Sequence, residues 1–432
     1  MKGRGVARRK VLIIAEAANP EWVSVPLVGW SLATALRAVA DVHVVTQVRN
    51  RDAFLRAGEV EGETFTAIDS EAFAAPLWAV AERLRGGEGK GWTTLQLVNA
   101  LAYPHFERLF WRRFGAEIRA GDWDIVHRIT PLSPTIASPV AAKVARAGVP
   151  FVLGPLNGGV PWPKAFDAER RREKEWLSYL RGAYKALPGR SRTLHAASAI
   201  LAGSRHTASE LPEAVQRKTI FLPENAVDPA RFQGRATPGE TFTGVFVGRL
   251  VPYKGPDMLL EAAAPLLRAG RMRLEIVGDG PMMPDLVAQA AALGIARAVT
   301  FHGWLDHGQV QDVMRRAHAL TFPSIREFGG GVVLEAMALG VVPIIVDYAG
   351  PAELVTPETA ITVPLADRGG VVAGLARALD RAASDPAALA PMAEAGAARI
   401  ARHFTWAAKA RQVTQVYDWV SGARSDRPEP FA

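Results

Sequence analysis

Short apolar runs alternate with longer helical patterns along most of this 432-residue chain. This alternation is typical of parallel sheets that carry helices on both faces. The strand candidates of the first half are Val11–Ala15, Val42–Thr46, Ile125–His127, Phe151–Leu153 and Ala199–Ala202. Those of the second half are Gly244–Val247, Arg273–Val277, Val299–His302, Ala319–Phe322 and Val342–Val346. The two series predict two doubly wound α/β domains.

The length supports this division, because 432 residues are too many for one core and suit two domains of roughly 200 residues each. The stretch 233–241 is rich in Gly and Pro and has no apolar periodicity, so we expect the boundary there. The predicted domains are residues 1–235 and 236–403, followed by a final segment at 404–432. In such folds, ligands bind at the carboxyl ends of the strands.

The composition excludes several classes of protein. Hydrophobic residues make up 49% and charged residues 22%, a globular mixture rather than that of a disordered, collagen-like or coiled-coil chain. The absence of Cys excludes disulfides, a thiolate nucleophile and Cys-ligated metal sites, and it fits a reducing compartment. The first apolar run ends at Glu16, too early for a signal peptide, and no uncharged apolar stretch is long enough to span a membrane. We expect a cytoplasmic protein with at most peripheral membrane contact.

The net charge of +8 comes from two segments. Residues 1–10 hold five basic residues and no acid, residues 169–192 hold eight against three acids, and the rest of the chain sums to −2. The second segment combines cations with aromatic residues at near-helical spacing, among them Arg170, Arg171, Arg172, Lys174 and Trp176. This pattern predicts a helix on an anionic membrane surface, with a solvated helix face as the alternative. Nucleic acid is not an expected partner, because no recognised binding module accompanies the segment.

The most informative stretch follows the strand candidate Ala319–Phe322. Three glycines, Gly329 to Gly331, precede a helix that we expect to begin near Val332. Glycines let the backbone approach a ligand, and a helix N-terminus offers free N–H donors, so this turn predicts a phosphate site. Glu327 and Glu335 bracket the turn with seven residues between them, where they could bind hydroxyl groups. The alternative is a glycine-rich turn with two solvated acids.

A second loop follows the strand candidate Gly244–Val247. It reads Gly248-Arg249-Leu250-Val251-Pro252-Tyr253-Lys254-Gly255. Alone it would be a surface loop with two charges. At the strand end of the same predicted domain, however, Arg249 and Lys254 could neutralise a diphosphate.

With these stretches the sequence resembles the retaining glycosyltransferases of family 4, whose GT-B fold has two Rossmann-like domains facing a central cleft. The family's E-x7-E element matches Glu327 and Glu335, and its Gly-Arg and Lys-Gly pairs match Gly248-Arg249 and Lys254-Gly255. Further matches are Gly278-Asp279-Gly280, Gly340-Val341-Val342-Pro343, Asn225-Ala226-Val227-Asp228 and Phe404-Thr405-Trp406. The resemblance covers nearly the whole chain and implies that the final helix returns to the first domain.

The resemblance also implies the roles of these residues toward a nucleotide-diphosphate sugar. Arg249 and Lys254 would hold the diphosphate, Glu335 the ribose hydroxyls and Glu327 the hydroxyls of the transferred sugar. The remaining implied donor contacts are Gly29, Gly248, Gly278, Trp304, Leu305, Phe328, Gly329, Gly330, Gly331 and Val332. Two cations and a helix N-terminus stabilise the charge that develops on a leaving diphosphate. Because no Asp-x-Asp element stands where one is expected, no metal and no cofactor is predicted.

The first domain departs from the family pattern in two places. The glycine-rich loop after the first strand reads Gly29-Trp30, where the family commonly has paired glycines. Trp30 would face the acceptor or pack in the core. The strand that usually carries His-x-His has His127 and, at the second position, Ile129. Either His127 takes the catalytic role by a small register difference, or it is a packing residue.

Asn157 lies in a turn after the strand candidate Phe151–Leu153, followed by Gly158 and Gly159. It would either contact an acceptor substrate or stabilise a tight turn.

The sequence therefore predicts a retaining, metal-independent glycosyltransferase. It would move a sugar from a nucleotide sugar to a glycan or lipid-linked saccharide acceptor in envelope or exopolysaccharide biosynthesis. A non-catalytic sugar-nucleotide-binding protein and a GT-B nucleotide-sugar epimerase are the alternatives.

Overall fold

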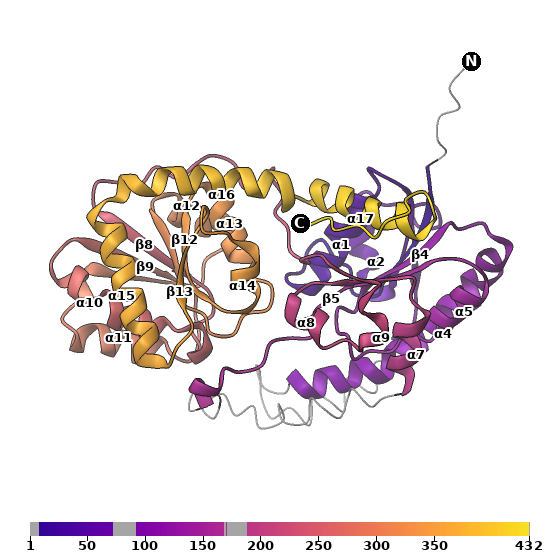
Figure 1. Ribbon diagram of the computed structural model, residues 1–432, viewed down its shortest axis with the longest axis horizontal. Coiled ribbons are helices and arrows are strands. Elements are labelled where there is room, and N and C mark those ends of the chain that lie inside the picture. The colour runs from indigo at the N-terminus through magenta and orange to yellow at the C-terminus, as the bar shows by residue number, and fades with distance from the viewer. Residues whose placement is uncertain (1–7, 72–91, 168–169, 171–187, 432) are drawn as a thin grey trace, which may run out of the picture. The chain divides into compact units, whose positions relative to one another are not determined.

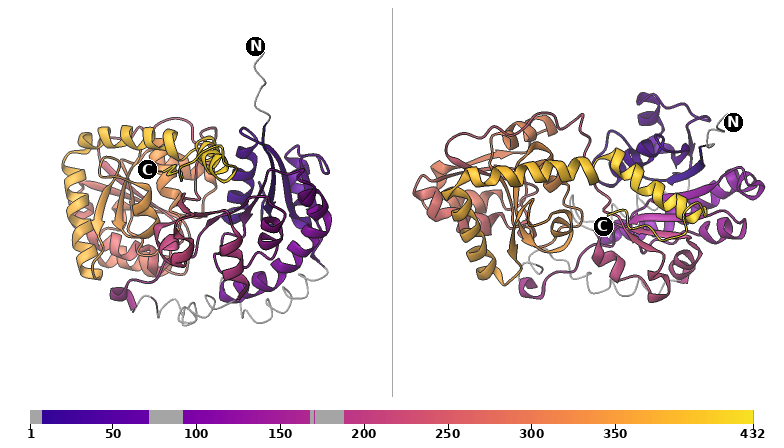
Figure 2. Two further views of the ribbon diagram at one scale, coloured as in Figure 1. Left: turned by 45° about the vertical axis from the view of Figure 1, so that its right-hand side comes forward. Right: turned by 45° about the horizontal axis from the view of Figure 1, so that its top comes forward.

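The computed structural model describes residues 8–71, 92–167, 170 and 188–431. The chain divides into two compact units (Figure 1). The first unit contains residues 1–158, 177–224 and 409–432, and the second contains residues 159–176 and 225–408. Each unit is built around one parallel sheet with helices on both faces, as Figure 2 shows from two further directions. The prediction of two doubly wound α/β domains is confirmed.

The first unit has a seven-stranded sheet in the order β3-β2-β1-β4-β5-β6-β7. Its strands are β1 (Lys10–Ala15), β2 (Asp41–Gln47), β3 (Phe65–Ile68), β4 (Ile125–Thr130), β5 (Phe151–Leu156), β6 (Ala199–Ala202) and β7 (Thr219–Phe221). All neighbours pair in parallel, and Val11 of the central β1 lies opposite Val42 on one side and Ile125 on the other. The five strands expected in this half are confirmed. The sequence did not predict the two edge strands, because β3 and β7 are short and carry too little apolar pattern.

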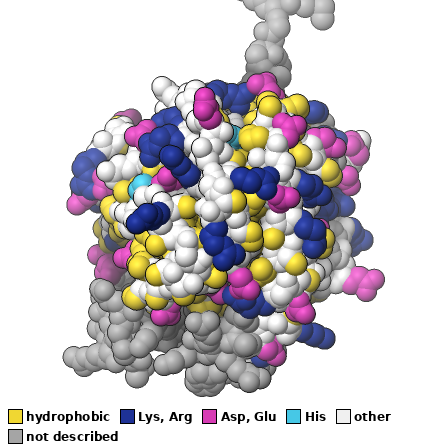
Figure 3. Space-filling model, turned by 90° about the vertical axis from the view of Figure 1, so that its left-hand side faces the viewer, with side chains coloured by type: hydrophobic (Ala, Val, Ile, Leu, Met, Phe, Trp, Pro, Cys, Tyr) yellow, Lys and Arg dark blue, Asp and Glu magenta, His cyan; other side chains and the backbone are white. Residues whose placement is uncertain are grey.

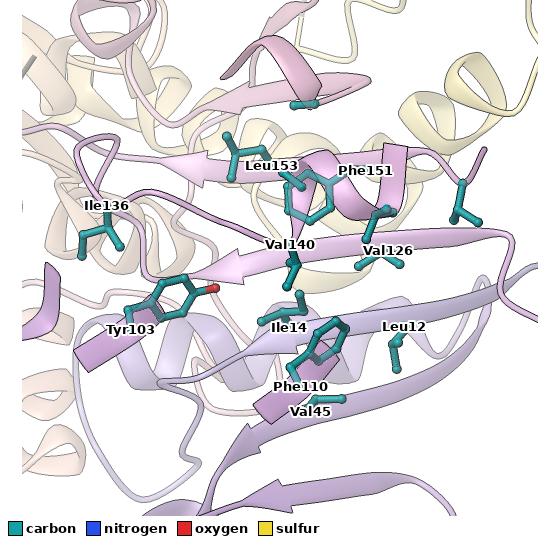
Figure 4. Close-up of a cluster of buried hydrophobic side chains, with 14 of the residues drawn as sticks. Leu12, Ile14, Val45, Tyr103, Phe110, Val126, Ile136, Val140, Phe151 and Leu153 are labelled. Atoms are coloured by element: carbon teal, nitrogen blue, oxygen red, sulfur yellow. The ribbon is translucent and has the colours of Figure 1, made fainter. Parts of the chain in front are cut away.

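The helices of the first unit bury apolar faces against this sheet. They are α1 (Val25–Leu36), α2 (Arg51–Arg56), α4 (Trp92–Ala120), α5 (Ala141–Arg146), α7 (Pro188–Ala196), α8 (Arg205–Ser209) and α9 (Glu213–Gln216). In α4, Tyr103, Phe106, Phe110, Phe114 and Ile118 recur every three or four residues and are all buried. This spacing places them on one helix face. Figure 4 shows Tyr103 and Phe110 of this face among side chains of β1, β4 and β5.

The second unit has a six-stranded parallel sheet in the order β10-β9-β8-β11-β12-β13. Its strands are β8 (Phe242–Val247), β9 (Met272–Val277), β10 (Val299–Gly303), β11 (Ala319–Phe322), β12 (Val342–Asp347) and β13 (Ile361–Pro364). Its helices are α10 (Pro256–Arg268), α11 (Met283–Ala292), α12 (His307–Arg315), α13 (Gly331–Leu339), α14 (Ala349–Leu354), α15 (Arg368–Ser384) and α16 (Ala390–His403). The five strands expected here are confirmed, and β13 was not predicted.

Both sheets reverse their strand order once. The chain builds each sheet outward from β1 or β8 in one direction and then continues on the other side with β4 or β11. Ligands of doubly wound folds bind outside the carboxyl ends of the strands at this reversal. In the second unit the reversal lies between β8 and β11, so the loops after these two strands form the expected site.

The boundary between the two units does not lie at the expected position, residues 235/236. Residues 225–408 belong to the second unit, where Val227 N donates a hydrogen bond of 2.7 Å to Phe404 O and the Phe404 side chain is buried. The Gly- and Pro-rich stretch is therefore a loop within the second unit, and Ala236 N bonds to Leu339 O there. Residues 159–176 also belong to the second unit, which the sequence did not indicate.

Residues 409–432 belong to the first unit and contain most of the last helix, α17 (Trp406–Val420). Tyr417 of this helix lies beside His127 of β4, with 2.7 Å between the hydroxyl oxygen and Nδ1. His127 Nε2 lies 2.7 Å from the Gly154 carbonyl oxygen, so this nitrogen carries the proton and Nδ1 accepts from Tyr417. Both side chains are fully buried, and burial lowers the pKa of His127 to about 4. The buried pair joins the end of the chain to the sheet.

No helix among the described residues is long and apolar enough to cross a membrane.

Tyr417→Phe should lower the free energy of unfolding by about 1–3 kcal/mol, because it leaves His127 Nδ1 buried without a donor. Urea unfolding followed by circular dichroism measures this loss. Thr414→Val is the matched control, since its hydroxyl bonds only to Ala410 O of the same helix; its effect should be below about 0.5 kcal/mol. Equal stability of Tyr417→Phe and the wild type would contradict this account of the helix.

Candidate functional site

The loop between β8 and α10 carries the two predicted cations. Arg249 follows the strand by two residues and is exposed, whereas Lys254 ends a short 3-10 turn and is only partly exposed. Gly255 then takes a φ of 69°, a left-handed conformation that favours glycine, and starts α10. The loop therefore presents both cations at the carboxyl end of β8.

The loop between β11 and α13 carries the predicted glycine turn. Gly330 has a φ of 58° and caps the helix that begins at Gly331, close to the predicted start at Val332. A Cβ built on Gly331 would meet nothing within 4 Å, so there is open space beside the first turn of α13, where helix N–H groups favour an anion. Phe328, Gly329 and Val332 are partly exposed around this turn. The geometry fits the predicted phosphate site.

Lys254 and Glu327 bring the two loops together by an ion pair between Nζ and Oε2. The two side chains are 14% and 19% exposed, and Lys254 Nζ also lies 4.7 Å from the centre of the Phe322 ring. Burial lowers the pKa of Lys254 to about 8, so the ammonium is protonated at neutral pH but near its titration range. A partly buried cation and its carboxylate partner thus lie at the reversal of strand order.

Glu335 lies in the second turn of α13 and is partly exposed. Burial raises the pKa of its carboxyl group, and the charge of Arg231 opposes this shift. Glu327 precedes the glycine turn at 329–331, and Glu335 follows it within α13. The two acids therefore flank the glycine turn, as predicted.

The remaining predicted donor contacts of this unit lie at neighbouring strand ends. Trp304 follows β10 and is 76% exposed, and Leu305 beside it is partly exposed. Gly278 follows β9 with a φ of 132°, and a Cβ at this position would lie 2.0 Å from the Gly248 carbonyl oxygen. The lack of a side chain at Gly278 therefore allows the loops after β8 and β9 to touch, whether or not this glycine also faces a ligand.

The sequence led us to expect Gly29 in a loop, and this expectation is wrong. It lies inside α1 and is buried, and a Cβ there would be 2.5 Å from Ala17 O. Glycine is needed so that the helix can approach the backbone after β1. Trp30 packs edge-on against Phe54 with 4.7 Å between ring centres, which supports the packing alternative for this residue.

His127 lies in the core of the first unit, with both ring nitrogens bonded to groups of the protein. A general base or a sugar-binding imidazole needs a nitrogen that can reach the substrate. Of the two roles left open by the sequence, the geometry favours packing. The catalytic role stays a prediction that the kinetics of a variant can test.

Asn157 follows β5 in the first unit. Its side-chain amide donates to a carboxylate oxygen of Glu224, a buried residue that the sequence did not single out. The next residue, Gly158, donates from its backbone N–H to Thr207 Oγ1 at 3.0 Å. Asn157 is thus held by its neighbours, and its partly exposed surface leaves the acceptor role open.

Most of the predicted membrane segment lies outside the described residues, including Arg171, Arg172, Lys174 and Trp176. Arg170 is described and pairs with Asp167 at 3.1 Å. On the face of the second unit that Figure 3 draws, basic and acidic side chains are interspersed without a patch of one sign.

The site also has neighbours that the motifs did not reveal. Val160, Pro161 and Trp162 belong to the second unit and contact its loops through Tyr253, Arg326 and Tyr348. The one available sequence signal was the rigid Pro-Trp-Pro stretch at 161–163. Among the described residues, no group of three or more His, Asp or Glu side chains is arranged to hold a metal ion.

Comparison with known proteins identifies the second unit. Residues 228–399, which make up most of this unit, match the family model described as glycosyl transferases group 1. Glycogen synthase of Mycobacterium tuberculosis is 34% identical over 220 residues, which are 49% of this chain and 51% of that protein. The chain thus spans about half the length of this curated relative. The 2-deoxystreptamine glucosyltransferase of Streptomyces kanamyceticus is 28% identical over 346 residues, 76% of this chain and 83% of that protein.

A solved structure shows the same fold over nearly the whole chain. Anabaena Alr3699/HepE in complex with UDP superposes with a TM-score of 0.61 at 16% identity, covering 94% of this chain and 99% of that one. The two parallel-sheet units are thus those of the GT-B fold.

Diphosphate affinity should fall above pH 8, because Lys254 loses its charge there. Once the amine is neutral, the dissociation constant of inorganic diphosphate should rise roughly tenfold per pH unit. Isothermal titration calorimetry between pH 7 and 9.5 measures this rise. Lys254→Arg is the matched control, because a guanidinium stays charged over this range and the protonation of the ligand itself is common to both proteins. Parallel pH profiles for the two proteins would contradict the assignment of Lys254.

Proposed function

We propose that this chain, whose second unit is a group 1 glycosyltransferase domain, is a retaining and metal-independent glycosyltransferase that takes a sugar from a nucleotide-diphosphate sugar. The observation that supports it most is the placement of Arg249, Lys254, Glu327 and the α13 N-terminus in the loops after β8 and β11, where the second sheet reverses its strand order and where Lys254 pairs with Glu327. Three groups there favour negative charge, and one carboxylate can accept hydrogen bonds from sugar hydroxyls.

The proposed reaction breaks the bond between the anomeric carbon and the diphosphate oxygen, whose electron pair stays on the diphosphate. The acceptor hydroxyl forms the new bond on the same face of the sugar, and its proton passes to the leaving diphosphate. Arg249, Lys254 and the first N–H groups of α13 stabilise the developing charge, which is the electrostatic work that a metal ion performs in other enzymes.

In this scheme, Lys254 and Glu327 exchange their ionic partners when the donor binds. The donor diphosphate replaces Glu327 as the partner of Lys254, which raises the pKa of the ammonium and keeps it protonated. Glu327, released from Lys254, turns to hydroxyl groups of the transferred sugar. Binding the complete donor thus satisfies both members of the pair at once, whereas a diphosphate without a sugar leaves the carboxylate to water.

We propose that the first unit binds the acceptor, a glycan or a lipid-linked saccharide in envelope or exopolysaccharide biosynthesis. Asn157 and Glu224 place polar groups at the carboxyl ends of the first sheet, where ligands of this fold bind. The glycosyltransferase relatives act on diverse acceptors by name, among them 2-deoxystreptamine, so they do not narrow the choice for this chain.

Arg249→Ala should reduce turnover of the preferred nucleotide sugar by about 100-fold or more, since it removes a cation from the leaving group. Release of the nucleotide diphosphate, with and without acceptor, measures turnover, and the same rate with EDTA as with Mg²⁺ is expected. The matched control is Arg273→Ala, which removes an exposed arginine at the opposite end of the adjacent strand β9. Near-normal turnover of Arg249→Ala would contradict the role of this residue. Donor binding without any turnover by the wild type would favour a sugar-nucleotide-binding protein.

We further propose that the basic segment at 169–192 attaches the enzyme to anionic membranes, on the evidence of its sequence pattern. Replacing Arg170, Arg171 and Arg172 by Glu should abolish sedimentation with vesicles that contain anionic lipid at low salt. The control changes Arg108, Arg112 and Arg119 of α4 to Glu, which alters the net charge equally. Equal sedimentation of the wild type and the first variant would contradict attachment through this segment.

A further inference from the structure

The segment Gly159–Asp167, which we call the strap, crosses the ligand-binding edge of the second sheet. The chain before Gly159 belongs to the first unit, yet residues 159–176 belong to the second. The strap is well packed: Val160 is buried, Trp162 is 9% exposed, and Phe166 in the short turn Lys164–Phe166 is inaccessible. A segment that comes from the first half of the chain is therefore built into the second unit.

Three consecutive residues of the strap contact three loops of the second unit. The Trp162 ring meets the Tyr253 ring edge-on, with 6.1 Å between their centres. The Val160 carbonyl oxygen accepts a bond of 3.2 Å from Arg326 Nε, and the Pro161 carbonyl oxygen accepts one of 3.0 Å from the Tyr348 hydroxyl.

The three loops are adjacent in the sheet. Tyr253, Arg326 and Tyr348 follow the carboxyl ends of β8, β11 and β12, which are neighbours in the strand order. The strap therefore spans the reversal between β8 and β11, where the ion pair of Lys254 and Glu327 lies.

Arg326 makes the strongest of these connections. Its side chain is 5% exposed, and its guanidinium carbon lies 5.1 Å from the Trp162 ring centre and 5.6 Å from that of Phe328. A planar guanidinium that lies near two aromatic rings and donates to a carbonyl is restricted in orientation. A buried charge of this kind is costly to leave without its partners, and the strap supplies two of them, the Val160 carbonyl oxygen and the Trp162 ring.

The strap also contacts the neighbour of each member of the ion pair. Arg326 immediately precedes Glu327, and Tyr253 immediately precedes Lys254. Because adjacent residues share a peptide plane, fixing Arg326 and Tyr253 restricts where the next two side chains begin.

We propose that the strap is part of the donor site and that Trp162 and Arg326 are positioning residues that aim Glu327 at the transferred sugar. This inference rests on the proposed function for the identity of the ligand. It assigns the specificity for the sugar part of the donor to a segment outside the family-matched residues 228–399. Lys254 is also held within its own 3-10 turn by the bond from its N–H to Val251 O. Loss of the strap contact should therefore affect recognition of the sugar by Glu327 more than recognition of the nucleotide diphosphate, which Lys254, Arg249 and the α13 N-terminus still bind.

Trp162→Ala tests this prediction. The variant should bind the preferred nucleotide sugar at least about tenfold more weakly and show a lower kcat, while its affinity for the nucleotide diphosphate alone changes less than about threefold. Trp162→Phe should recover most of the sugar-dependent affinity, because it keeps an aromatic face for Arg326. Calorimetry and donor turnover measure both properties on the full-length protein.

Trp111→Ala is the matched control. Trp111 lies on α4 in the first unit and contacts two cations, Arg119 and Lys143, at ring-centre distances of 5.4 and 5.3 Å. It should leave donor affinity unchanged at a melting temperature comparable with that of Trp162→Ala. The inference is overturned if Trp162→Ala retains sugar-dependent affinity, if it weakens the sugar and the diphosphate ligands equally, or if Trp111→Ala weakens donor binding as much. A wild-type protein that neither binds nor turns over any nucleotide sugar would instead overturn the proposed function.

Discussion

The ion pair between Lys254 and Glu327 is the interaction on which the rest of the site depends. It joins the loops that follow β8 and β11, the two strands between which the second sheet reverses its order. Burial keeps the ammonium close to its titration range, with a pKa of about 8, and each charge is the other's partner within the protein. A ligand with a diphosphate beside hydroxyl groups can satisfy both charges, and a nucleotide-diphosphate sugar has this chemistry.

The loops and the helix around the ion pair hold its two side chains in place. Gly255 and Gly330, both in the left-handed region, allow each loop to turn directly into its helix, and the N-terminus of α13 adds N–H donors beside the cations. The strap restricts both loops from outside through Tyr253 and Arg326. In the first unit, His127 and Tyr417 perform a different task, because their buried hydrogen bond holds the last helix on the sheet.

Much of this could be predicted from the sequence. Buried parallel strands such as β1 and β12 are nearly continuous apolar runs, so their positions follow from local pattern. The edge strands β3 and β13 could not be found in that way, because their partly exposed side chains lack such a run. The motifs also located Arg249, Lys254 and Glu327. They could not reveal the strap or the Glu224 partner of Asn157, since these contacts join residues far apart in the chain. Gly29 was interpreted from the sequence as a ligand contact, but glycine is required at this position by the packing of α1 against Ala17.

The most direct test of the account is a crystal structure of the protein with its nucleotide sugar bound. We expect Lys254 Nζ within about 3 Å of a diphosphate oxygen and Glu327 within hydrogen-bonding distance of a hydroxyl of the transferred sugar. The anion should also meet the first N–H groups of α13. A diphosphate bound elsewhere, with Lys254 still paired to Glu327, would contradict the central claim that the donor exchanges the partners of this pair.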